Sequence, residues 1–116
     1  MNGHLARCAE SLRKAVRYLA NSSCAPKEKL RGMYDTEFGS IWHDDFPDGS
    51  LKDDYLTIIS SIIKTDEPKA AVNIAAMSDE QARKVISQIC SLSEGVAYVL
   101  GRQSVSALSV EGHSHD

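Results

Sequence analysis

The 116-residue chain has the length of one domain, and its 42% hydrophobic and 25% charged residues are ordinary for a globular protein. These values exclude a chain that is disordered throughout, and the recurring charges leave no run of the roughly 20 apolar residues that a membrane-spanning helix needs. The net charge of −3 conceals a basic start, with seven Lys or Arg against two acids in residues 1–31, and an acidic middle, with three against eleven in residues 32–80.

The first predicted helix covers residues 4–21. Its apolar positions recur at intervals of three and four residues and form one stripe, which consists of Leu5, Cys8, Ala9, Leu12, Ala15, Val16, Leu19 and Ala20. The charged residues fall largely outside this stripe, and Arg7, Lys14 and Arg17 lie close to one face. The near-heptad rhythm is typical of a seam in a helical bundle.

A second helix is predicted to begin near Pro26, because proline is tolerated in the first helical turn. Its apolar positions continue to Trp42, and Gly39 marks either a break or a close helix crossing. Residues 43–49 are then predicted to form a turn, because Pro47 has a fixed φ and Gly49 permits a positive one.

The third helix is predicted to start with Ser50 as its N-cap. Asp53 and Asp54 would lie in its first turn, where the helix dipole favours negative charge. The isoleucines that follow come as two pairs, 58–59 and 62–63, and this four-residue repeat favours a helix over a strand.

Two further helices are predicted in the second half. Residues 69–77 form a short alanine-rich segment, and Ser78 with Gln81 has the spacing of a capping box that starts a long helix. Gly95 inside this helix is either a packing contact or a bend, and Gly101 is expected to close it. The serine-rich residues that follow predict a disordered tail beyond about residue 108.

These elements predict an all-α fold, a small helical bundle of four main helices plus one short helix, with a disordered C-terminal tail. We expect a single helical domain over residues 1–108 and a flexible tail over residues 109–116. The segment 70–77 is nearly all apolar and the last helix carries a wide apolar stripe. Together they offer more apolar surface than one small bundle covers, so we expect a homodimer.

The acidic-aromatic segment 42–54 is the main candidate for function, because it holds the only tryptophan, a histidine and five aspartates. Its last residues are explained by the predicted turn and helix start. The candidates for binding a partner are Trp42, His43, Asp44, Asp45, Phe46 and Asp48. Aromatic side chains flanked by acidic ones are typical of an interface anchor and its rim. A structural interpretation stands beside this one, in which Trp42 and Phe46 anchor the turn and the aspartates face water.

A metal site is an alternative interpretation of the same segment, since His43, Asp44, Asp45 and Asp48 are ligand types for divalent ions. A metal-binding protein or a metal-dependent enzyme would use them. The acid spacing of a calcium-binding loop is absent from the sequence, as are a phosphate loop, a nucleophile elbow and a paired-histidine helix motif. We therefore expect no catalytic residues, no cofactor and no metal ion.

The basic face of the first helix gives a second alternative, a nucleic-acid-associated regulator. Only Tyr18 supplies an aromatic ring nearby, and no DNA-binding helix pattern follows it, so nucleic acid is not the expected partner. The same face suits an acidic protein surface, and the segment 42–54 of another copy is one such surface.

The three cysteines have neither metal-binding nor redox-motif spacing. Cys8 and Cys90 fall on apolar faces and are expected to be buried, whereas Cys24 lies in a predicted loop and is expected to be exposed. The start of the chain lacks the apolar core of a signal peptide, so we expect a cytoplasmic protein. The function that these patterns favour is that of a small non-enzymatic helical protein that binds another protein, as an adaptor, inhibitor or immunity-like regulator.

Overall fold

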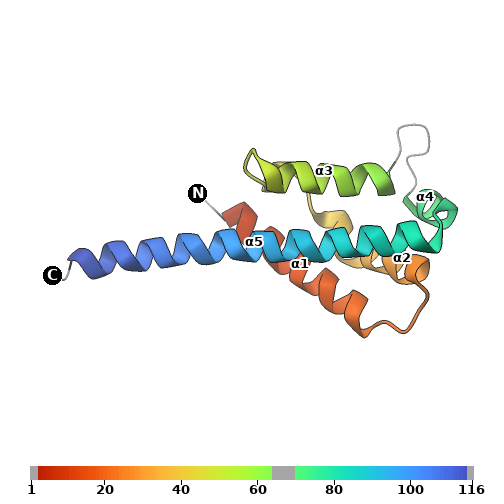
Figure 1. Ribbon diagram of the computed structural model, residues 1–116, viewed down its shortest axis with the longest axis horizontal. Coiled ribbons are helices and arrows are strands. Elements are labelled where there is room, and N and C mark those ends of the chain that lie inside the picture. Colours follow the sequence, from red (N-terminus) through yellow and green to blue (C-terminus); the bar gives the residue numbers. More distant parts are fainter. Residues whose placement is uncertain (1–2, 64–69, 115–116) are drawn as a thin grey trace.

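The computed structural model describes the backbone of residues 3–63 and 70–114, and the side chains of residues 4–63 and 73–102. All regular structure in these ranges is helical, in the order α1 (Gly3–Asn21), α2 (Pro26–Thr36), α3 (Ser50–Ile62), α4 (Ala70–Ala76) and α5 (Asp79–Ser114) (Figure 1). Two single 3-10 turns, η1 (Phe38–Ser40) and η2 (His43–Asp45), lie between α2 and α3. The predicted all-α bundle of four main helices and one short helix is confirmed.

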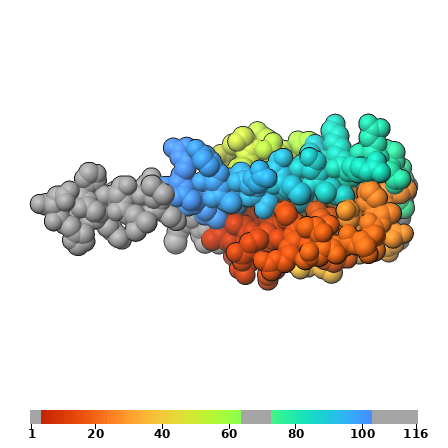
Figure 2. Space-filling view, turned by 60° about the horizontal axis from the view of Figure 1, so that its bottom comes forward, coloured from red at the N-terminus to blue at the C-terminus, as the bar shows by residue number. Residues whose placement is uncertain are grey.

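Helix α5 is the axis of the bundle. It packs against α1, α2 and α3, and its C-terminal part continues beyond them (Figure 1). In the space-filling view of Figure 2, α1 and α5 lie side by side. One face of α5 enters the core at helical spacing through Ala82, Val85, Ile89, Leu92 and Val96.

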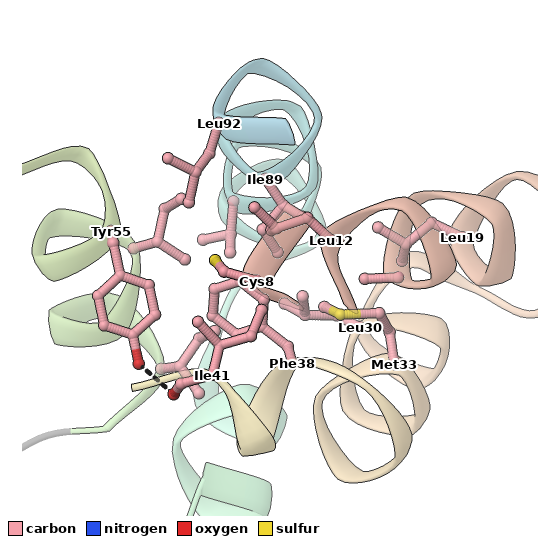
Figure 3. Close-up of a cluster of buried hydrophobic side chains, with 14 of the residues drawn as sticks. Cys8, Leu12, Leu19, Leu30, Met33, Phe38, Ile41, Tyr55, Ile89 and Leu92 are labelled. Atoms are coloured by element: carbon pink, nitrogen blue, oxygen red, sulfur yellow. Dashed lines mark hydrogen bonds between the residues drawn. The ribbon is translucent and has the colours of Figure 1, made fainter. Parts of the chain in front are cut away.

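A single hydrophobic core joins these helices (Figure 3). The stripe predicted on the first helix supplies five of its members, namely Leu5, Cys8, Leu12, Ala15 and Leu19. Facing them are Leu30 and Met33 of α2, Phe38 of η1, and the α3 side chains Tyr55, Ile58 and Ile62. The helices therefore meet through the apolar faces that the sequence pattern indicates.

The predicted helix starts are correct at α2 and α5 and wrong at α3. Pro26 is the first residue of α2, and the Ser78 Oγ accepts a hydrogen bond of 3.1 Å from the Gln81 N–H. At α3 the N-cap is Gly49 and Ser50 is already helical. Gly49 has a φ of 138°, which glycine adopts without the steric penalty that a Cβ brings, so the cap lies one position earlier than predicted.

Helix α2 ends at Thr36, earlier than predicted, because the chain turns sharply at η1. A Cβ at Gly39 would lie 2.9 Å from the carbonyl oxygen of Tyr34, so this close approach of two backbone segments needs glycine. The break predicted as one role of Gly39 is therefore the one found.

The prediction that Gly101 closes the last helix is wrong, since α5 continues through it to Ser114. Glycine inside a helix costs about 1 kcal/mol relative to alanine, which the long helix tolerates. Gly95 is a packing contact, where a Cβ would lie 2.9 Å from Cδ2 of Leu51 in α3. The flexibility predicted for residues 109–116 stays a prediction, with residues 115–116 outside the described part.

Helix α4 lies where the short alanine-rich helix is predicted. Asn73, Ile74 and Met77 are buried, whereas Ala75 and Ala76 are exposed. The side chains of residues 70–72 lie outside the described residues. The proposal that segment 70–77 offers apolar surface to a second copy therefore stays a prediction.

Candidate partner-binding surface

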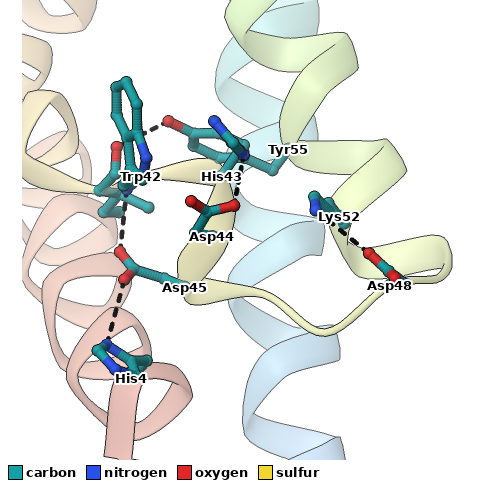
Figure 4. A network of polar contacts seen from close by, with 9 residues as sticks. His4, Trp42, His43, Asp44, Asp45, Asp48, Lys52 and Tyr55 are labelled. Carbon is teal, nitrogen blue, oxygen red and sulfur yellow. Dashed lines mark hydrogen bonds and ion pairs between the residues drawn. The ribbon is translucent and has the colours of Figure 1, made fainter.

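Asp45 fixes the backbone around Trp42. Its Oδ2 accepts a hydrogen bond of 2.9 Å from the Trp42 N–H, and its own N–H donates to the Trp42 carbonyl oxygen at 3.0 Å. The Asp45 Oδ1 lies 3.8 Å from Nδ1 of His4 in α1 (Figure 4). These reciprocal bonds satisfy the backbone groups at the start of η2, as a capping box does at a helix start.

Tyr55 of α3 holds the same segment from the core. Its hydroxyl donates a hydrogen bond of 2.7 Å to the Ile41 carbonyl oxygen (Figure 3). Its ring centroid lies 4.9 Å from that of Phe46. Ile41 and Phe46 are both buried, so the chain is fixed on either side of η2. Burial, with smaller contributions from Tyr34, Cys8 and Asp45, raises the pKa of Tyr55 to about 12, so the hydroxyl keeps the proton it donates.

Trp42 lies on the outside of this fixed segment (Figure 4). It is 61% exposed, and its ring centroid lies 4.9 Å from that of His43. Asp44 stands next to His43, with its Oδ1 3.0 Å from the His43 Nδ1, and its side chain is 69% exposed. Trp42, His43 and Asp44 thus form one accessible group, which we call the Trp42 surface.

Three predicted partner-binding residues lie outside the Trp42 surface. Phe46 is buried against Tyr55, so its assignment to a binding surface is corrected to a core role. The carboxylate of Asp45 already accepts a hydrogen bond from the Trp42 N–H and contacts His4. Asp48 is exposed but lies apart, beside Lys52, whose Nζ is 3.2 Å from its carboxylate (Figure 4).

The structural interpretation of the aromatic pair is correct for Phe46 and wrong for Trp42. Phe46 anchors the turn in the core, whereas Trp42 remains mostly in water. The physical reason is Tyr55, whose ring offers Phe46 a partner inside the bundle.

The four residues predicted as metal ligands do not converge. His43 faces Asp44, while Asp45 faces the Trp42 backbone and Asp48 faces Lys52. Among the described residues, no group of three or more His, Cys, Asp or Glu side chains is arranged to hold a metal ion. The geometry gives the metal-binding interpretation of this segment no support.

Sequence reasoning missed His4 and Tyr55 as neighbours of the site. The role of Tyr55 could have been inferred from the sequence, because a tyrosine on an apolar stripe needs a hydrogen-bond partner for its hydroxyl. The role of His4 could not, since only the crossing of α1 past η2 brings it to Asp45.

Cys8 is buried and Cys24 is exposed, as predicted, and all three cysteines are free. Cys8 is buried in the core, and burial, with a smaller effect of Asp45, raises its pKa to about 12. Cys90 is half-buried, and burial and Glu94 raise its pKa as well. Cys24 is exposed, so it is the thiol open to reagents in water.

A hollow of about 560 Å³ lies at the C-terminal half of α1. Its lining consists of Lys14, Arg17, Tyr18, Asn21, Ser22 and Glu37. Tyr18 is 37% exposed, and its hydroxyl lies over Gly32 of α2, where a Cβ would overlap with it. The predicted basic face is therefore divided, with Lys14 and Arg17 at the hollow and Arg7 beside His4 at 3.1 Å.

Comparison with known proteins gives no assignment, since no family model, curated protein or solved structure matches this chain. Within the described ranges, no helix has both the length and the apolar character needed to cross a membrane. The Trp42 surface and the hollow are therefore the features from which we infer a function.

Proposed function

We propose that this chain is a small non-enzymatic regulatory or adaptor-like protein that binds another protein through the Trp42 surface. The observation that carries the proposal is a tryptophan that is 61% exposed on a backbone held by Asp45 and Tyr55. Tryptophan is enriched among the residues that dominate interface energies, where truncation costs about 2 kcal/mol or more. A backbone that is already fixed loses little entropy when it binds.

The chemistry of the Trp42 surface indicates what its partner offers. The indole of Trp42 presents an apolar face and an N–H that can only donate. Asp44 presents a carboxylate whose one ion-pair partner among the described residues is the half-exposed His43. A matching partner has an aromatic or apolar recess with a hydrogen-bond acceptor, and a basic side chain at its edge.

A cytoplasmic location is part of the same proposal. Its support is chemical, since Cys8, Cys24 and Cys90 are all free thiols and an oxidising compartment favours disulfides.

The test is capture of tagged protein from its own cells, with four variants compared to the wild type. Trp42→Ala and Asp44→Lys alter the Trp42 surface. Tyr98→Ala and Asp54→Lys are matched controls, because Tyr98 is 65% exposed on α5 and Asp54 is exposed on α3. We expect a stoichiometric protein that both controls retain and that Trp42→Ala loses. Equal recovery by Trp42→Ala and by Tyr98→Ala would remove the proposal.

A further inference from the structure

The hollow carries groups that complement an exposed tryptophan. Arg17 supplies a guanidinium, Tyr18 an aromatic face and Glu37 a carboxylate. Among the described residues, neither Arg17 nor Glu37 takes part in a salt bridge, and Lys14 has only a 4.0 Å contact with Glu10 on the same helix. The charges of Arg17 and Glu37 at the hollow are thus not neutralised by another described side chain.

Each of these groups matches one in the Trp42 surface. An indole packs on a tyrosine ring in offset or edge-on geometry, and a guanidinium stacks on an indole face. The indole N–H can only donate a hydrogen bond, and the Glu37 carboxylate is an acceptor at the hollow. Lys14, at the edge of the hollow, has the charge opposite to that of Asp44.

We propose that the partner of the Trp42 surface is a second copy of this chain, whose hollow receives the Trp42 indole. This inference rests on the function proposed above and names its partner. The hollow is open in the same structure in which Trp42 is exposed, so Trp42 does not fill the hollow of its own chain.

The position of the two surfaces favours a closed pair of copies. Helix α1 contacts both η1 and η2, so it links the hollow to the Trp42 surface. Its first turn meets Asp45 at His4, and its last turns line the hollow together with Glu37, the residue before η1. Because one helix carries both regions, a two-fold axis between two copies would make the contact twice.

The test is sedimentation of the full-length chain over a concentration series up to the millimolar range. We expect a reversible dimer whose dissociation constant rises at least about tenfold in Asp44→Lys and in Lys14→Glu, the loss typical of a close interfacial charge pair. The double variant, with both changes, places opposite charges across the interface again and is expected to recover most of the affinity. Lys84→Glu on α5 is the matched charge control, because Lys84 is exposed and does not line the hollow.

Circular dichroism of each variant verifies that the fold is kept. A dimer that persists in Trp42→Ala, or single variants that the double variant does not rescue, would overturn the inference. A chain that is monomeric throughout, but captures a different protein through Trp42, overturns this inference and leaves the proposed function standing. A monomer without any Trp42-dependent capture removes both.

Discussion

The Tyr55 hydroxyl donates a hydrogen bond of 2.7 Å to the carbonyl oxygen of Ile41, across 14 positions of the chain and inside the core. Ile41 immediately precedes Trp42, so this bond ties the backbone that presents Trp42 to helix α3. Phe46, on the other side of η2, packs on the same tyrosine ring. The stability of the bundle and the position of the exposed indole therefore depend on one side chain.

Tyr55→Phe is expected to lower the free energy of unfolding by about 1–3 kcal/mol, because it leaves a buried carbonyl oxygen without its donor while the ring contacts remain. Urea unfolding measures the change. Tyr98→Phe is the matched control, since Tyr98 is exposed, and it is expected to stay within about 0.5 kcal/mol of the wild type. Equal unfolding midpoints for the two variants would contradict the role given to Tyr55.

Most of the fold could be predicted from local sequence patterns. The features that could not be predicted depend on contacts between residues far apart in the chain. The stripe of Leu5, Cys8 and Leu12 and the cap at Ser78 depend on neighbours within a few residues, so both were predictable. In the candidate site, Trp42 and Phe46 look alike in sequence. They differ in the structure because, of these two residues, Phe46 packs against Tyr55 of α3, a contact between residues nine positions apart that the local pattern does not reveal.

Two glycine substitutions are expected to act in opposite directions. Gly49→Ala should destabilise the chain by about 1–3 kcal/mol, because Gly49 has a φ of 138° that a residue with a Cβ adopts under strain. Gly101→Ala should stabilise it by up to about 1 kcal/mol, since a Cβ there meets nothing within 4 Å and α5 is helical at this position. Thermal unfolding of both variants provides the comparison. A destabilised Gly101→Ala variant would indicate that the helix ends at Gly101 after all.

The thiols are expected to differ in their reactivity. Native protein treated with iodoacetamide should label rapidly at Cys24, which is exposed, and slowly at Cys8, whose pKa burial raises to about 12. Cys90, half-buried with a raised pKa, should also label slowly. Mass spectrometry of tryptic peptides resolves the three sites. Rapid labelling that persists in Cys24→Ser without denaturant would contradict this order.

The free energy of unfolding is expected to fall as the pH rises from about 9 towards about 12. Burial is the main cause that raises the pKa of Cys8 from 9.0 to about 12. It also raises the pKa of Tyr55 from 10.0 to about 12. Both groups are neutral when protonated, so the folded chain keeps protons that the unfolded chain releases above those ordinary values. The unfolded state then binds fewer protons, and its relative stability grows with pH.

Urea midpoints over this pH range test the effect of Cys8. Cys8→Ala is expected to show a shallower decline than the wild type, because one of the two groups is gone. Cys24→Ala, which changes an exposed thiol, is the control and should keep the wild-type slope. The same slope in both variants would exclude the proposed contribution of Cys8.

The most direct measurement of the central claim places a photo-crosslinking aromatic amino acid at position 42, in the chain produced in its own cells. The same amino acid at position 98 is the control, because Tyr98 has a similar exposure on α5. We expect a defined covalent adduct from position 42 that position 98 does not form, and a second copy as partner would add 12.7 kDa. Irradiation that gives no adduct at position 42, or the same adducts at both positions, would contradict the assignment of Trp42 as the residue that contacts a partner.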